Sequence, residues 1–307
     1  MKRTPRAVAW AFLLALLPVP LLAQEGSGDA TADEGSRTDW FPGEFVVAPL
    51  QAAPLEVRLG GGLIVTERDI EDSIDGSNLE AQVAVGVRIP VVRFQDEAPG
   101  RPAIDLGFEV GVFSRFFMES IEKEQIDTDH RVGVPLGIRY GMWDVRLTLL
   151  HVSSHFGDDY LDDNPQPVFQ VSREGLELLL GIRPGFDGRL YVGGDLNLGR
   201  SEDFTGTGDP DDPFVIFTTV EQWAFRFGAE WDPTRWGDKQ IAPFAAADFE
   251  VTEFTERIAS HVVAGAAFRI KTVRLLLNAE FHDGPSPMGQ FRTIDERWFG
   301  ASLTVEL

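Results

Sequence analysis

Three side chains in the middle of the chain are of the types that nucleophilic catalysis requires. His151 and Ser153 stand two residues apart, and Glu174 lies in the following apolar segment. A serine hydroxyl, an imidazole that accepts its proton and a group that orients the imidazole together make an acyl-hydrolase site. In this hypothesis Ser153 is the nucleophile, His151 is the base, and Glu174 or Gln170 is the orienting group. The three can act together only if the chain places them side by side on one surface.

A two-residue alternation of apolar and polar side chains predicts the elements that carry these groups. Within residues 103–113, the side chains on one face are all apolar, namely Ile104, Leu106, Phe108, Val110 and Val112. Successive side chains of a strand point to opposite faces, so this run has one apolar and one polar face. About a dozen such segments predict an all-β fold, a transmembrane, antiparallel up-and-down β-barrel of the outer-membrane type. The alternative is a secreted β-sandwich, which would bury the apolar faces against each other.

Twelve segments fit the pattern, an even number, as single-chain bacterial barrels have. They are predicted at 56–66, 79–93, 103–117, 131–140, 143–153, 168–182, 189–199, 214–231, 240–250, 260–270, 273–282 and 296–307. With the N-terminus in the periplasm, odd strands should be followed by long loops, such as 154–167, and even strands by short turns, such as 141–142. Pro135 and Pro243 count against this assignment, because a proline within a barrel strand removes a ladder hydrogen bond.

The strand assignment places the predicted catalytic residues on the outer wall of the barrel. Trp143 and the alternate apolar residues after it face outward, which gives His151 and Ser153 the same direction. Ile182 and the alternate leucines before it give Glu174 the outward direction on the next strand. His151 lies eight residues from Trp143, and Glu174 lies eight residues from Ile182. The two side chains should therefore sit at one height, near the outer leaflet, where a hydrolase would act on membrane lipid.

The predicted inward face carries charges of both signs in similar number. These residues are Arg88, Asp105, Glu109, Arg139, Asp144, Arg146, Asp195, Arg226, Glu230, Asp248, Arg269, Arg274 and Glu280. Such a lumen is either closed by ion pairs or conducts with weak ion selectivity. Barrels of about twelve strands lie between side-chain-filled small barrels and open porins. The default function is therefore a structural or transport barrel of unknown cargo, and the lipid acyl hydrolase is the alternative.

The start of the chain has the pattern of a secretory signal peptide. Three basic residues precede an apolar run that begins at Ala7. We expect residues 1–23 to be the signal peptide, 24–54 to be a flexible N-terminal segment and periplasmic arm that could enter the barrel mouth, and 55–307 to be the barrel. This predicts export to the outer membrane of a Gram-negative bacterium. The chain has no cysteine, so disulfides and thiol nucleophiles are excluded.

The formal net charge of −22 disfavours nucleic-acid binding, which needs a basic surface. The acidic residues gather in a few predicted outer loops, and the simplest interpretation is that these loops are solvated. A more specific hypothesis is that they bind divalent cations at a lipopolysaccharide surface, with Asp158, Asp159 and Asp162 as calcium ligands. The expected partners are outer-membrane lipid and lipopolysaccharide, and the sequence does not indicate whether there is a protein partner.

Two resemblances support these expectations. The His-x-Ser pair at His151 and Ser153 resembles those of outer-membrane phospholipase A and of the lipid A deacylase family, although the Asn-Gly that often follows that serine is absent here. A longer likeness rests on residues 40–42, 151–158 and 171–176, which resemble segments of an uncharacterised bacterial family, domain of unknown function 1207. That second resemblance implies an outer-membrane barrel and carries no established activity.

Overall fold

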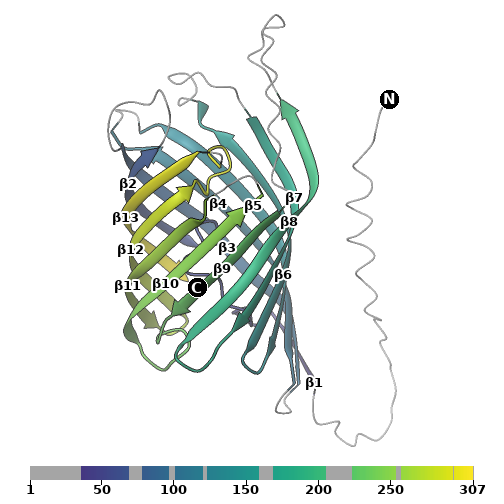
Figure 1. Ribbon diagram of the computed structural model, residues 1–307. Coiled ribbons are helices and arrows are strands. Elements are labelled where there is room, and N and C mark those ends of the chain that lie inside the picture. The colour runs from purple at the N-terminus through teal and green to yellow at the C-terminus, as the bar shows by residue number, and fades with distance from the viewer. Residues whose placement is uncertain are drawn as a thin grey trace, which may run out of the picture. The chain divides into compact units, whose positions relative to one another are not determined.

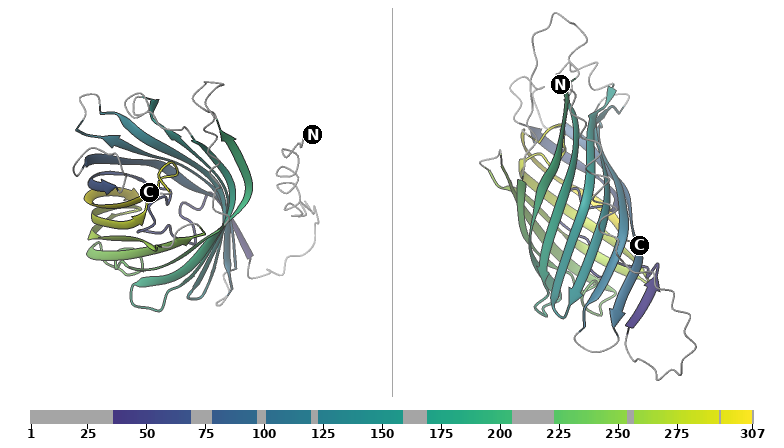
Figure 2. Two further views of the ribbon diagram at one scale, coloured as in Figure 1. Left: turned by 45° about the horizontal axis from the view of Figure 1, so that its top comes forward. Right: turned by 90° about the vertical axis from the view of Figure 1, so that its right-hand side faces the viewer.

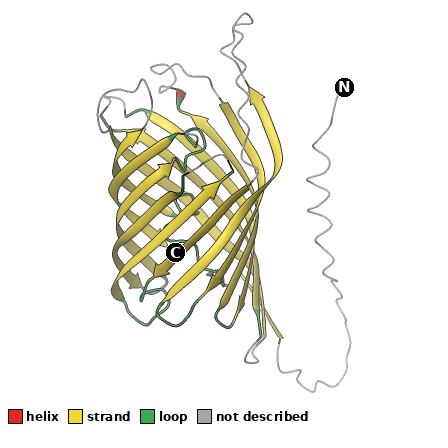
Figure 3. Cartoon of the chain, viewed as in Figure 1, coloured by secondary structure: helices red, strands yellow, loops and turns green. Residues whose placement is uncertain are grey.

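Twelve antiparallel strands close into a barrel in the computed structural model (Figures 1 and 3). The structure describes residues 36–68, 78–96, 101–119, 123–158, 169–204, 223–253, 257–292 and 294–306. The barrel strands are β2 (Leu59–Arg68), β3 (Asn78–Asp96), β4 (Ala103–Phe117), β5 (Gln125–Tyr140), β6 (Trp143–Phe156), β7 (Phe169–Ile182), β8 (Gly188–Phe204), β9 (Trp223–Trp231), β10 (Ile241–Thr252), β11 (Ala259–Ile270), β12 (Val273–Pro285) and β13 (Asp295–Glu306). Each strand pairs with the next, and β13 pairs with β2 to close the ring. This closure confirms the predicted barrel and excludes the β-sandwich.

The strand bounds differ from the sequence prediction at a few ends. β2 begins at Leu59 rather than at residue 56, because the residues before it lie inside the lumen. β5 begins at Gln125, earlier than the predicted 131. A short strand that was not predicted, β1 (Ser36–Trp40), pairs with the end of β3 that extends beyond β2. The predicted signal peptide, residues 1–23, and the first part of the predicted strand at 214–231, residues 214–222, lie outside the described part of the chain.

The two prolines that counted against the barrel lie where their strand is unpaired on one side. Pro135 lies at an interruption in the β4–β5 pairing, which stops at Leu106 opposite Leu136 and resumes at Glu109 opposite Gly133. Pro243 lies on the part of β10 that precedes the first pair with β9. Because no ladder hydrogen bond is required on that side, the missing amide proton costs little.

The outer wall of the barrel is apolar and its interior is polar, as the alternation predicts. Outward side chains such as Val85 and Phe299 are more than half exposed, whereas inward Asp105 and Arg146 are almost fully buried. Trp143 and Trp231 are exposed at short-turn ends of strands, where an aromatic belt is expected. Trp236, in the β9–β10 turn, is partly buried, and its ring lies under the guanidinium groups of Arg189 and Arg235. No helix within the described residues is long and apolar enough to cross a membrane.

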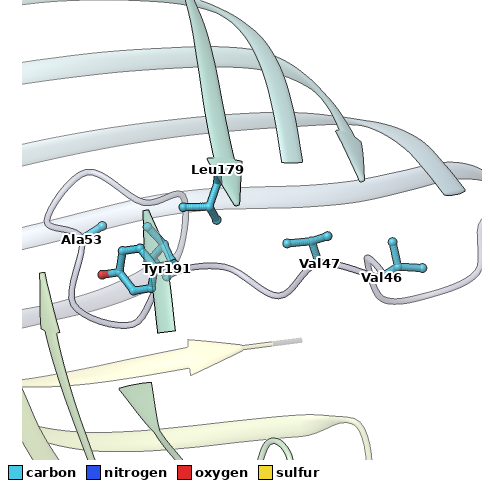
Figure 4. Packing of buried hydrophobic residues seen from close by; sticks show 6 residues of the cluster. Val46, Val47, Ala53, Leu179 and Tyr191 are labelled. Atoms are coloured by element: carbon cyan, nitrogen blue, oxygen red, sulfur yellow. The ribbon is translucent and has the colours of Figure 1, made fainter. Parts of the chain in front are cut away.

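The chain between β1 and β2, residues 41–58, is called the inner segment here; its first residues are exposed, and from Val46 onward it runs inside the barrel (Figure 2, left). Its Val46, Val47 and Ala53 belong to a buried cluster with Leu179 of β7 and Tyr191 of β8 (Figure 4). This is the segment that was expected to be an irregular arm near the barrel mouth. It is almost free of regular structure, so its backbone polar groups depend on side chains of the barrel wall.

A second segment enters the lumen from the opposite end. The connection between β12 and β13, residues 286–292, is called the inward loop here, and its Met288 and Phe291 are buried. Both belong to one apolar cluster with Val57 of the inner segment and Phe113 of β4. The two segments therefore share a common core within the barrel.

Candidate functional site

The predicted catalytic residues lie on β6 and β7, which are paired in one continuous register. The pairing runs from Trp143 opposite Ile182, at the short-turn end of the barrel, to His151 opposite Glu174. This unbroken ladder is the reason that counting eight residues from Trp143 and from Ile182 brings these two side chains to the same height. Both face outward, and their side chains are 46% and 50% exposed.

The structure brings two of the three predicted residues into contact. Nδ1 of His151 lies 3.6 Å from Oε1 of Glu174, slightly beyond hydrogen-bond distance. Ser153 lies on the same outward face but makes no hydrogen bond to His151 among the described contacts, and its strand neighbour on β7 is Ser172. The side chain of Gln170, the alternative orienting group, lies outside the described part of the chain. The arrangement therefore places the predicted base beside its orienting group, without a hydrogen bond from the predicted nucleophile Ser153 to the base.

The sequence hypothesis missed a second imidazole beside the serine. His130 of β5 is the direct cross-strand neighbour of Ser153, and it is exposed. Its ring also contacts His155 edge to face, with centroids 5.9 Å apart. The signal was present in the sequence, because His130 has the same parity as the outward Val132 and Val134. The outward direction of His130 follows only if β5 begins before residue 130, and the predicted strand began at 131.

The lumen holds a different constellation, in which three guanidinium groups alternate with three carboxylates. Glu56 of the inner segment accepts two hydrogen bonds from Arg146 of β6. Arg146 also donates to Glu177 of β7 at 2.8 Å, and Arg131 bridges Glu177 and Glu109 at 3.3 and 3.0 Å. The third cation, Arg88 of β3, lies 3.2 Å from Glu109 and 3.9 Å from Glu56. Because the charges balance, this network holds the inner segment without a net buried charge.

The rest of the inner segment is bound through its backbone. Arg189 of β8 donates to the carbonyl oxygens of Ala48 and Pro49 at 2.8 and 3.0 Å. The carboxylate of Glu230 accepts from the amide of Gln51 at 2.6 Å and also pairs with Arg189 at 2.7 Å. Such contacts recognise an irregular chain by its peptide groups, so the barrel wall fixes where the segment runs.

The inward loop is bound in a similar way at the other end of the lumen. The amide of Gly289 donates to Oδ2 of Asp129 at 2.9 Å, and the side-chain amide of Gln290 donates to the carbonyl oxygen of Ser154 at 2.7 Å. The ring of Phe291 packs edge to face on Phe156, with centroids 5.4 Å apart. The lumen is therefore filled from both ends by parts of the same chain.

The predicted calcium ligands are only partly described. Asp158 is exposed at the end of β6, and Asp159 and Asp162 lie outside the described residues. Within the part of the chain that is described, no three acidic or histidine side chains are grouped to hold a metal ion. Calcium binding stays a prediction.

An apolar outer wall, a charged interior and a closed ring of strands define an outer-membrane-type β-barrel protein. The sequence profile of the family described as "Protein of unknown function (DUF1207)" matches residues 34–304. The chain belongs to this family, the one that its sequence resembles. No curated protein matches the chain.

Solved structures resemble the barrel at low sequence identity. Outer membrane phospholipase A from Escherichia coli is 15% identical, with a TM-score of 0.51 over 84% of this chain and 93% of that chain. The transport unit of the autotransporter AIDA-I from Escherichia coli is 11% identical, with a TM-score of 0.41 over 99% of both chains. At these identities the first likeness shows the fold alone, and the second adds no argument about function.

Proposed function

We propose that this protein is a transport barrel of the Gram-negative outer membrane, closed at rest by its inner segment and its inward loop. The observation that carries the proposal is the inner segment itself, which occupies the lumen and is bound by Arg146, Arg189 and Glu230 of the barrel wall. A barrel with a purely structural role needs no such segment, because side chains alone can fill a small barrel. The N-terminal signal predicted at 1–23 accounts for export to this membrane.

The bonds that hold the two segments are of a kind that water can replace. Most are hydrogen bonds to charged groups or to peptide carbonyls, and cavities flank them on both sides. One cavity, of about 130 Å³, lies between Glu56 and the inward loop, and a second, of about 400 Å³, lies beside Gln51 toward the short turns. At these polar groups, displacement would exchange protein partners for water, which costs less than leaving the groups unpaired.

Planar-bilayer recording tests this proposal directly. We expect the parent protein to be silent and a variant with Gly/Ser linkers of equal length in place of residues 43–55 and 287–291 to conduct in discrete steps. Equal-length replacement of the β7–β8 turn, residues 184–187, is the matched control, because that turn lies outside the lumen. Heat-modifiable migration on gels establishes that each variant has formed a barrel. Steady conductance by the parent, or silence of the folded double-linker variant, would contradict the proposal.

A lipid acyl hydrolase is the second and less favoured candidate. The contact between His151 and Glu174 supports it, and the lack of a hydrogen bond from Ser153 to His151 speaks against it in this conformation. Apo sites often tighten only around substrate, so the idea remains testable. The measurement is release of fatty acid from phospholipid or lipid A in mixed micelles. Turnover that Ser153→Ala abolishes would support a hydrolase, and equal turnover in both proteins would remove it.

A further inference from the structure

The larger cavity lies at the short-turn end of the barrel, which faces the periplasm in outer-membrane barrels. Its volume is about 400 Å³, within the range of small-molecule sites. Its walls come from the inner segment, from β3, from the β11–β12 turn and from the end of β13. The β9–β10 turn contributes Arg235, and β12 contributes Arg274, so parts of the chain far apart in sequence converge on one space.

The charge of this cavity is opposite to that of the protein. Six cationic side chains line it, namely Arg58, Arg88, Arg235, Arg269, Lys271 and Arg274. Only three carboxylates line it, those of Glu44, Glu56 and Glu306. In a chain whose formal net charge is −22, a positively charged cavity is a local feature that the overall composition does not explain.

Three of the cations have no carboxylate partner within the described part of the chain. The guanidinium of Arg58 donates to the carbonyl oxygens of Ala53 and Pro54 at 3.1 and 2.6 Å, and that of Arg269 donates to the carbonyl oxygen of Arg235 at 3.1 Å. Lys271 is exposed in the β11–β12 turn. All three therefore line one cavity without a carboxylate among the described residues to neutralise them, and an anion bound there would be attracted to all three.

One buried donor also lacks an acceptor. Nη2 of Arg88 has no hydrogen-bond partner, although the side chain is only 8% exposed and its other nitrogens face Glu109 and Glu56. A buried guanidinium nitrogen normally finds an acceptor, because leaving it unpaired carries a desolvation penalty. An oxyanion in the cavity would supply the missing acceptor.

We propose that this cavity is a binding site for a small multivalent oxyanion, of the phosphate or polycarboxylate class, that enters from the periplasm. Guanidinium groups match such oxyanions in geometry, because their planar forks donate two parallel hydrogen bonds. Arg269 and Lys271 contact the anion near the mouth, and Arg58 and Arg88 contact it deeper in the cavity. The site belongs to the resting barrel, so it does not rest on the proposed transport role.

Isothermal titration calorimetry on the refolded full-length protein in detergent tests the site. The probes are pyrophosphate and citrate, which separate phosphate from carboxylate recognition, and spermidine serves as a cation of similar size. We expect saturable binding of at least one oxyanion, no binding of spermidine, and an affinity that falls as sodium chloride is raised. The double variant Arg269→Gln with Lys271→Gln should weaken binding at least tenfold.

The variants are chosen so that misfolding cannot be mistaken for loss of the site. Arg269 and Lys271 lie at the end of β11 and in its exposed turn, whereas Arg58→Gln also removes contacts that hold the inner segment and serves as a second, deeper probe. Arg257→Gln removes the same charge from an exposed residue that pairs with Asp283 and Asp295, and should bind as the parent does. Absence of saturable oxyanion binding, equal binding by the parent and the double variant, or equal binding of spermidine would each overturn the proposal.

Discussion

The charge balance around Glu56 makes a quantitative prediction about how firmly the inner segment is held. In the lumen network three carboxylates face three guanidinium groups, so Glu56→Gln leaves one uncompensated buried cation. Removing one partner of a buried ion pair costs about 3–5 kcal/mol. Arg146 keeps Glu177 at 2.8 Å, which favours the lower end, about 3 kcal/mol. At about 1.4 kcal/mol for each factor of ten, the docked-to-undocked ratio should fall roughly a hundredfold.

A single introduced cysteine can report this equilibrium, because the chain has none of its own. Ala52 is fully buried where the inner segment meets the wall, so Ala52→Cys should react with a soluble maleimide only when the segment undocks. We expect labelling to be roughly a hundredfold faster in the Glu56→Gln background. Asp238→Asn is the matched control, since it removes one negative charge from an exposed turn and should leave the rate unchanged.

The double variant Glu56→Gln with Arg146→Gln separates charge balance from simple loss of contacts. It leaves Arg88 and Arg131 facing Glu109 and Glu177, so the network is again neutral. Labelling should therefore be slower than the product of the two single effects predicts, which is the signature of a coupled pair. A rate in Glu56→Gln within threefold of the parent, or strictly multiplicative effects in the double variant, would refute the electrostatic account of docking.

Three further predictions concern other parts of the barrel. Phe291→Ala should lower the free energy of unfolding by about 3 kcal/mol or more, measured in urea, because the ring is fully buried against Phe156. Burial alone would raise the pKa of Asp232, but Arg274 and Arg235 hold this pKa below its usual range. Its stabilisation is therefore complete above the ordinary aspartate pKa of about 3.9 and is lost as the pH falls through the lower folded value. The stability difference between the parent and Asp232→Asn should be constant from pH 7 to 5 and shrink below about pH 4. Calorimetry with millimolar calcium should show weak binding if the loop that begins at Asp158 holds the cation, and absence of heat would leave that loop solvated.

The barrel could be predicted from the sequence because its cause is local. Side-chain alternation is a property of each single strand, so Trp143 and Ile182 define the outward faces of β6 and β7 independently of the strands that pair with them. The contact between His151 and Glu174 followed from the same rule, because β6 begins and β7 ends at the short-turn end of the barrel and their register is unbroken from there. The register of a strand pair fixes which side chains meet.

The contents of the lumen could not be predicted in this way. The inner segment has no period, and its course is set by distant side chains such as Arg189 and Glu230, which lie far away in sequence. Glu56 was assigned to the first strand because nothing local distinguishes it from a strand residue; only the balance with Arg146 and Arg88 draws it inward. His130 was missed because the true start of β5 lies earlier than its apolar pattern suggests.

The pairing of β1 with β3 has a consequence for how the inner segment could move. The segment is held at one end by β1 and at the other by β2, and both of these strands pair with β3. It is therefore a closed loop rather than a free tail, and an undocked segment cannot diffuse away. Its local concentration at the lumen stays in the range that short flexible tethers give, about millimolar or higher. Any opening is then a reversible, unimolecular event whose frequency is independent of protein concentration, and the barrel carries its own means of closing again.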